Sequence, residues 1–277
     1  MEDEIGKVIS MKKPAVVVKF GKLDDFDLPK TIYKYRDWSD HYHKRFILER
    51  EVFLASPKTF EDELDCHNPT RFDLLTKDQI YDYFIWSSKK ENPLFSRQRH
   101  RAFARDWAKH SLVNDKNYTK KFMEDSVTEY YEREGILSLT ENWDNDAMWK
   151  KYAAENKGFC IGYDTRIIFK YLGGGGPVSY TNEIPIIMPE PFMKFEEAMR
   201  NRVYYKLKKW EFEDEYRTKK FWPHPASINE RQIQLPIEAF KRVILGDEIS
   251  LKHKLEIERA VKKNIGNIEI VERKNAS

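Results

Sequence analysis

Short runs of β-branched and aromatic residues recur towards both ends of the chain, separated by polar residues, glycine or proline. Such runs predict strands, because these side chains fit the pleated, half-buried surface of a sheet. The runs lie at residues 15–20, 31–36, 52–55, 136–140, 158–163, 178–180, 243–245 and 268–271. An acidic segment ending at Pro29 is expected to connect the first two runs, and Ser56-Pro57 ends the third.

Between residues 76 and 134 the apolar positions follow a helical period instead. Ile80 and Phe84 have the spacing of one helix face, and so do Phe103 and Trp107. We therefore predict a helical insertion over about residues 70–134. Shorter helices are expected at residues 146–154, 191–209 and 250–263. Strands near both ends that enclose helices predict a single α+β domain over residues 1–277, with a mixed central sheet.

The composition is typical of a folded protein with a heavily charged surface. Charged residues make up 34% of the 277 residues, but aromatic residues make up 14% and bury large areas, which argues against disorder. The net charge of +3 excludes a bulk polycation. Any binding of nucleic acid must therefore come from a local patch.

The sequence also predicts where the protein acts. The start Met1-Glu2-Asp3-Glu4 is acidic and lacks the apolar core of a secretory signal peptide. No apolar stretch approaches the ~20 residues that a membrane span needs. The two cysteines exclude a disulfide framework. We therefore expect a cytoplasmic protein with reduced thiols and no membrane contact.

The first candidate site is the segment Tyr33-Lys34-Tyr35-Arg36. Alternation along a strand puts Lys34 and Arg36 on one face and both tyrosines on the other. A pair of cations at a strand end suits a phosphate or pyrophosphate, because arginine offers a planar fork of donors. The alternative is a pair of buried tyrosines with solvated charges on the other face.

The second candidate site is the acidic segment of residues 210–217. If this segment is a strand, Trp210, Phe212 and Tyr216 point inward from one face. The charged residues Glu211, Glu213, Glu215 and Arg217 then share the other face. Three carboxylates so close repel one another and require a compensating cation, which makes them a candidate site. The alternative is a charged edge strand or helix face.

A third candidate is cationic. Four basic residues recur every four positions, and on a helix they form one stripe. They are Arg97, Arg101, Arg105 and Lys109. Like charges at this spacing disfavour an isolated helix, so the stripe suits a polyanion such as RNA or DNA. The alternative is a solvated surface helix.

Metal binding is not predicted. Asp62, Asp65 and His67 are close in the chain, but their spacing matches no known ligand pattern.

Four segments, taken in order, resemble the bacterial domain-of-unknown-function family 2971. They are Tyr33-Lys34-Tyr35-Arg36; Ser56-Pro57 with Phe60, Asp62 and Asp65; Met148-Trp149 with Tyr152-Ala153 and Gly158-Phe159; and Trp210 with Glu213, Glu215, Tyr216 and Arg217. The resemblance covers about residues 30–250. It departs at Glu61 and Glu63, where the family commonly has Asn and Pro, and at Asn156, where it often has His.

Members of this family are similar to genes found near bacterial phage-defence and toxin–antitoxin systems. The resemblance therefore implies a role as a toxin or effector in defence, with an antitoxin or another defence protein as partner.

A more distant resemblance, to ADP-ribosyltransferases of the Arg-Ser-Glu type, implies a reaction. Those enzymes carry an Arg on an early strand, a Ser at a strand end and a late Glu-x-Glu pair. Arg36, Ser56 and Glu213-x-Glu215 occur here in that order. The resemblance implies an ADP-ribosyltransferase-like sheet and NAD as the substrate.

The same resemblance implies roles for the residues. Breaking the nicotinamide–ribose bond builds positive charge on the ribose, which a carboxylate stabilises. Glu215 is expected to contact the ribose, Glu213 the acceptor and Arg36 the pyrophosphate. Ser56 would position the ligand, and aromatic side chains would sandwich the nicotinamide. The expected NAD-binding residues are Arg36, Tyr35, Ser56, Trp149 and Tyr152.

Two other classes of function stay open at this point. One is a non-catalytic sensor or partner-binding module, in which the same acids and arginines form a structural ion-pair network. The other is a nucleic-acid-binding protein or nuclease that works through the cationic stripe and the acids Asp62 and Asp65.

Overall fold

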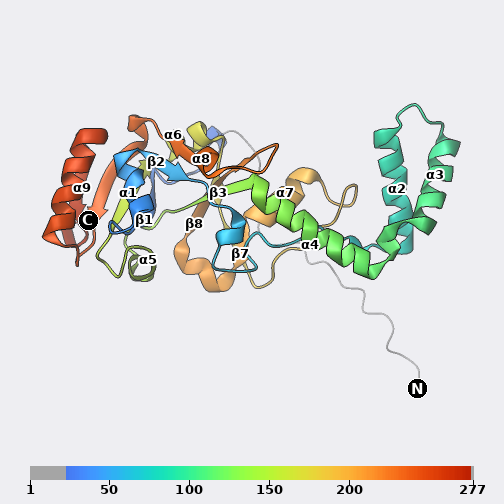
Figure 1. The fold of residues 1–277 in the computed structure, drawn as a ribbon, viewed down its shortest axis with the longest axis horizontal. Coiled ribbons are helices and arrows are strands. Elements are labelled where there is room, and N and C mark those ends of the chain that lie inside the picture. The colour runs from blue at the N-terminus through green and yellow to red at the C-terminus, as the bar shows by residue number, and fades with distance from the viewer. Residues whose placement is uncertain (1–22, 276–277) are drawn as a thin grey trace, which may run out of the picture.

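The computed structural model describes residues 23–275, so the strand expected at residues 15–20 lies outside the described residues. The main sheet has seven strands in the order β11-β10-β4-β1-β3-β8-β5 (Figure 1). They are β1 (Thr31–Arg36), β3 (Glu134–Thr140), β4 (Phe159–Asp164), β5 (Gly176–Pro177), β8 (Glu215–Phe221), β10 (Phe240–Leu245) and β11 (Glu269–Glu272). Neighbours are antiparallel except β10 and β11, so this is a mixed sheet in an α+β fold, as predicted.

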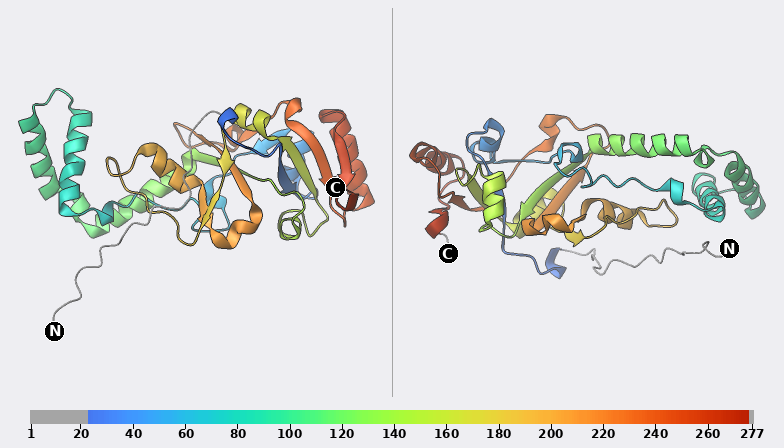
Figure 2. Two further views of the ribbon diagram at one scale, coloured as in Figure 1. Left: turned by 180° about the vertical axis from the view of Figure 1, so that it is seen from behind. Right: turned by 90° about the horizontal axis from the view of Figure 1, so that it is seen from below.

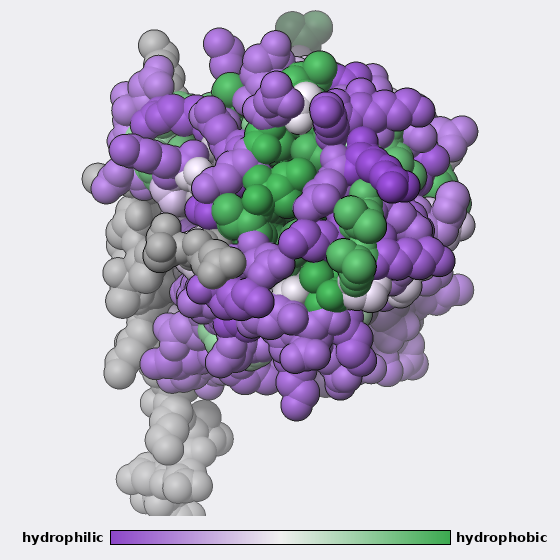
Figure 3. All heavy atoms as spheres, turned by 90° about the vertical axis from the view of Figure 1, so that its left-hand side faces the viewer, coloured by the Kyte–Doolittle hydropathy of each residue, from purple (hydrophilic) through white to green (hydrophobic). Residues whose placement is uncertain are grey.

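Within residues 23–275, two pairs of short strands and six helices surround the sheet. β2 (Glu51–Phe53) pairs with β9 (Gln232–Gln234), and β6 (Ser179–Thr181) pairs with β7 (Tyr205–Leu207). The helices are α1 (His41–Leu48), α5 (Asp146–Tyr152), α6 (Thr165–Leu172), α7 (Phe195–Val203), α8 (Ile228–Arg231) and α9 (Leu251–Asn264). At the end of the molecule that carries α9, apolar patches interrupt a mainly hydrophilic surface (Figure 3).

Strand β1 is buried on both faces. Ile32 belongs to the main apolar cluster, together with Ile161 of β4 and Ile257 of α9. Tyr33 and Tyr35 belong to a second cluster on the other face, packed against α5. The alternation predicted for the two tyrosines is therefore confirmed. A strand held by two clusters is a rigid support for the remaining side chains of β1.

The helices predicted over residues 76–134 are confirmed. They are α2 (Lys77–Glu91), α3 (Arg97–His110) and α4 (Lys116–Arg133). Side chains cap the start of each: Thr76 in a capping box, Ser96 and Asp115. α2 and α3 form an antiparallel pair that stands apart from the sheet, and α4 leads back to β3 (Figures 1 and 2).

Two predicted elements differ from the structure. The helix expected over residues 191–209 is limited to α7, because Tyr205 and Lys206 pair with β6 instead. The strand expected over residues 210–217 begins only at Glu215. It follows a 3₁₀ turn, Lys208–Glu213, and Asp214 in the left-handed region at φ 42°. The break turns the chain between Glu213 and Glu215, and it leaves Glu211 exposed, so the three glutamates do not share one strand face as predicted.

Candidate functional site

A pocket opens in the sheet where β1 and β3 part. β1 pairs with β4 at six positions, but with β3 only at Tyr33, opposite Thr140. Further along, Lys34 Nζ reaches across the opening and donates to the Ser138 carbonyl at 2.5 Å. The pocket has a volume of about 350 Å³. Its walls come from β1, β3, α5, residues 59–65 and residues 206–215.

One wall of the pocket is a buried ion network centred on Arg217. Its guanidinium donates to both carboxylate oxygens of Asp65, at 2.8 and 2.6 Å, and to both of Glu215, at 2.6 and 3.0 Å. Lys206 Nζ donates to Glu213 at 2.5 Å and to Glu215 at 3.2 Å. Each of these side chains is at least nine-tenths buried. We call these five residues the ion network.

The ion network keeps Glu215 ionised. Burial alone would raise the pKa of this carboxyl group, but Arg217 and Lys206 outweigh burial and lower it to about 2. Burial likewise opposes the charged form of Lys206, yet the neighbouring glutamates raise its pKa. With every member ionised, three carboxylates face two cations, and the network has one net negative charge.

The pocket brings together most of the predicted NAD-site residues. The predicted residues that line it are Arg36, Tyr35, Tyr152, Glu213 and Glu215. Arg36 and Glu215 lie far apart along the chain, in β1 and β8. The Tyr152 hydroxyl donates to Glu213 Oε1 at 2.7 Å. The two glutamates are therefore within one pocket with the predicted arginine.

Ser56 and Trp149 do not line this pocket. The Ser56 hydroxyl donates to the Tyr131 carbonyl at 2.7 Å and accepts from the Lys58 amide, which fixes the turn after β2. Trp149 is fully buried beneath Tyr35, edge to face at 5.1 Å between ring centroids. Ser56 therefore holds the turn after β2, and Trp149 packs in the core beneath Tyr35 with its indole N–H donating to the Trp143 carbonyl at 2.9 Å.

Three pocket residues were missed as members of the predicted site. Lys206 belonged to the predicted helix, and nothing in the local pattern separates it from a surface lysine. The sequence offers Asp65 as a metal ligand or a nuclease acid, whereas in the structure its partner is Arg217. Trp210 lines the pocket and donates its indole N–H to Asp62 at 2.8 Å. The sequence contained one signal for such a residue, because acidic side chains that lie close together need a compensating cation nearby.

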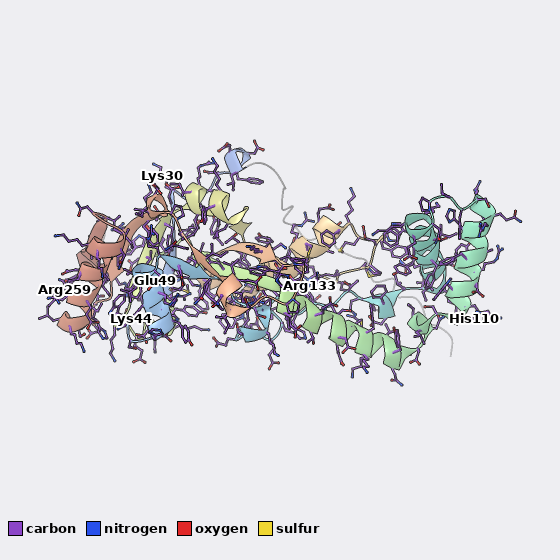
Figure 4. The ribbon with its side chains drawn as sticks, turned by 45° about the horizontal axis from the view of Figure 1, so that its top comes forward. Lys30, Lys44, Glu49, His110, Arg133 and Arg259 are labelled. Atoms are coloured by element: carbon purple, nitrogen blue, oxygen red, sulfur yellow. The ribbon has the colours of Figure 1, made fainter. Side chains whose placement is uncertain are left out.

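The cationic stripe lies elsewhere. Arg97, Arg101, Arg105 and Lys109 are all exposed on α3 and share one face of it. We call them the α3 stripe. His110, at the end of the same helix, lies far from Arg259 of α9 at the opposite end of the molecule (Figure 4). None of the four stripe residues lines the pocket, so the stripe is a separate surface.

A larger pocket, of about 1270 Å³, lies beside α4 and α7 and is lined mainly by apolar side chains such as Phe169, Met199 and Phe221. None of the predicted site residues lines it. Across residues 23–275, no helix combines the length and the apolar character that crossing a bilayer requires.

Comparisons of the chain with protein-family models, with curated proteins and with solved structures found no match. Function is therefore inferred from the geometry and charge of the pocket.

Proposed function

We propose that the protein is an NAD-consuming ADP-ribosyltransferase and that the pocket between β1 and β3 is its active site. The observation that carries this proposal is the meeting of Glu213, Glu215 and Arg36 in one pocket, together with aromatic side chains of α5 and the turn after β7. The parting of β1 and β3 supports an ADP-ribosyltransferase-like sheet, in which a dinucleotide lies across the opening.

The charge of the ion network suits the bond that must break. The ribose C1–nitrogen bond breaks with its electron pair going to nicotinamide, which leaves positive charge on the ribose. A preorganised negative group stabilises that charge without reorganising. Glu215 is ionised, and three carboxyl groups of the network face only two cations. Its oxygens already accept from Arg217 and Lys206, so they are fixed in position before the substrate arrives.

The acceptor completes the reaction by attacking ribose C1 and releasing a proton. Glu213 is the residue that would orient the acceptor or receive this proton. Its carboxylate accepts from the Tyr152 hydroxyl and from Lys206, so it also lies at a defined place in the pocket. Tyr152 and Trp210 supply ring faces for the nicotinamide.

The biological setting rests on the resemblance to family 2971. It supports a toxin or effector role in bacterial phage defence, with an antitoxin or another defence protein as partner. The two cysteines of the chain are free and buried thiols, which suits a reducing, cytoplasmic location.

Nicotinamide release from NAD tests the proposal. The purified full chain is assayed alone and with cell lysate as a source of acceptor, beside Glu211→Gln as a control. Glu211 is exposed, lies next to the pocket turn and is outside the ion network. The proposal requires release by the wild type and by the control. No release under either condition would favour the non-catalytic module, for which the ion network is purely structural.

The α3 stripe favours a second candidate function, contact with RNA or DNA. Its four cations are exposed on a helix that projects from the sheet. The test replaces its three arginines by Gln and measures retention on a polyanion column against salt. The matched control replaces three exposed α4 lysines, Lys116, Lys120 and Lys121.

A further inference from the structure

The larger pocket beside α4 and α7 plays no part in the proposed active site and shares no lining residue with it. Its volume of about 1270 Å³ exceeds the ~300–1,000 Å³ of ordinary small-molecule sites, so it has room for a long ligand. Its walls come from α4, α6, α7, residues 173–176 and β8. We call it the apolar pocket.

Large apolar side chains gather around this hollow. Phe169 of α6 is fully buried in its wall, and Met199 of α7 is partly buried there. Phe195 and Phe221 also line the pocket, yet they remain 61% and 46% exposed. A single exposed apolar side chain needs no explanation, but several around one cavity are typical of a binding site.

The run of four glycines that follows α6 forms another wall of the apolar pocket. Gly173 ends the helix in the left-handed region, at φ 90°, and Gly174 follows at φ 119°. A Cβ added at Gly173, Gly174 or Gly176 would meet no atom within 4 Å, whereas one at Gly175 would lie 2.6 Å from the Phe169 ring. The wall beside Phe169 is therefore bare backbone, which leaves space for a ligand.

A stack of cations and aromatic rings forms a third wall. The Arg202 guanidinium lies 4.6 Å from the centroid of the Tyr130 ring, and that ring stacks on Phe221 at 6.2 Å between centroids. The Arg133 guanidinium lies 4.9 Å from the Phe221 centroid. Lys219 lies two residues before Phe221, on the same face of β8. Contact with a ring face holds a guanidinium in place without neutralising its charge.

Two of these cations have carboxylate partners. Arg133 pairs with Glu129 at 2.8 Å, and Lys219 pairs with the buried Glu134 at 3.3 Å. The charged residues that line the whole pocket show an excess of cations as well: Arg133, Lys170, Arg200, Arg202 and Lys219 against Glu129 and Glu196.

Arg202 is the cation of the stack that has no carboxylate partner. It donates to the Asn68 carbonyl and to the Thr70 hydroxyl, both at 3.3 Å. Within residues 23–275 it forms no ion pair at 4.0 Å or less. Three cations of this wall therefore face only two carboxyl groups. A partly buried guanidinium in this position is positioned by neutral groups and suits an anionic ligand.

We propose that the apolar pocket binds a free long-chain carboxylate, with its acyl chain against Phe169 and Met199 and its carboxylate on Arg202. One cation in excess matches a carboxylate better than a phosphate monoester, which has a charge of about −1.5 to −2 at pH 7. An acyl chain needs no hydrogen bonds along its length. A peptide would bring N–H and C=O groups that these apolar side chains cannot pair.

Equilibrium binding of radiolabelled palmitate to the full chain, compared with its uncharged analogue hexadecanol, tests the proposal. We expect palmitate to bind at least tenfold more tightly than hexadecanol. Arg202→Met should weaken palmitate binding at least tenfold and leave hexadecanol binding unchanged, because only the carboxylate contacts Arg202. Unchanged hexadecanol binding also shows that the pocket of this variant is intact.

A second variant fills the pocket instead of removing the charge. Met199→Trp should weaken the binding of both ligands at least tenfold, because the indole occupies the space of the acyl chain. Arg259→Met is the matched control, since Arg259 is exposed on α9 and lies far from Arg133 of the pocket wall (Figure 4). It should bind both ligands as the wild type does.

Several results would overturn the proposal. Equal binding of palmitate and hexadecanol would remove the role of Arg202, and binding of neither would remove the site. Unchanged palmitate binding in both pocket variants would place the ligand elsewhere, and an equal loss in the control would mean attraction to net charge. Sedimentation with phosphatidylglycerol vesicles that Met199→Trp abolishes would make a membrane the source of the acyl chain. None of these measurements uses nicotinamide release, so the site stands or falls separately from the proposed transferase.

Discussion

Replacing Glu215 by Gln removes one charge from the ion network and keeps the volume of the side chain. The difference between its pKa of about 2 and the ordinary 4.5 is worth about 3 kcal/mol of folding free energy at pH 7. This agrees with the roughly 3–5 kcal/mol that breaking a buried ion pair costs. We expect Glu215→Gln to lower the melting temperature by about 6–12 °C.

The same substitution should also slow catalysis. If Glu215 stabilises charge on the ribose, its loss raises the barrier by about 3–4 kcal/mol and slows nicotinamide release by a factor of roughly 10²–10³. Asp65→Asn is the matched variant, because it removes the other carboxylate of Arg217 and leaves Glu215 in place.

Both variants are assayed at a temperature well below the lower of their two melting points. The proposed role requires that Glu215→Gln lose far more activity than Asp65→Asn at a similar loss of stability. Equal losses of activity would assign Glu215 to the fold alone. A folded Glu215→Gln protein with wild-type activity would show that the catalytic carboxylate is a different residue.

Three further outcomes follow from the structure. Because the pKa of Glu215 is lowered on folding, its contribution to stability is present above pH 4.5 and is lost as the pH falls towards 2; urea unfolding should show this loss in the wild type and not in Glu215→Gln. Replacing the three arginines of the α3 stripe by Gln should lower the log–log salt slope of nucleic-acid binding by about 2–3, and an unchanged slope would exclude the stripe as the binding surface. A Cβ at Gly158 would lie 2.2 Å from the carbonyl oxygen of the last residue of β1, so Gly158→Ala should destabilise the fold by about 1–3 kcal/mol in thermal melts. Gly176→Ala should not destabilise the fold, because a Cβ added at Gly176 would have no atom within 4 Å.

The pattern of apolar and polar residues correctly predicted those strands and helices whose signal lies in neighbouring positions of the sequence. The residues of β1 alternate, and both its tyrosines pack on one face as expected. The helical period of residues 76–134 became α2, α3 and α4 because each has an apolar face and a capping side chain at its start. Such features depend on neighbours within a few residues, which a sequence displays directly.

Features set by distant pairing were missed for the opposite reason. The bond between Arg217 and Asp65 joins residues 152 positions apart, and no spacing rule links them. Lys206 leaves the helical pattern only because β7 pairs with β6. The repulsion among the acids did indicate that a cation must be near, but the fold alone determined which one.

The distribution of charge in the pocket bears on the choice between a catalytic and a purely structural role. A structural network needs only that each buried charge have a partner, and the ion network around Arg217 and Lys206 meets that requirement by itself. It does not explain Lys34 and Arg36, which form no ion pair with a carboxylate of residues 23–275. Buried charges that cost stability are concentrated at binding sites, where the ligand supplies the missing partner. A pocket with one negative wall and one unpaired cationic wall fits a ligand that develops positive charge at one end and has phosphates at the other, as NAD does during cleavage of its glycosidic bond.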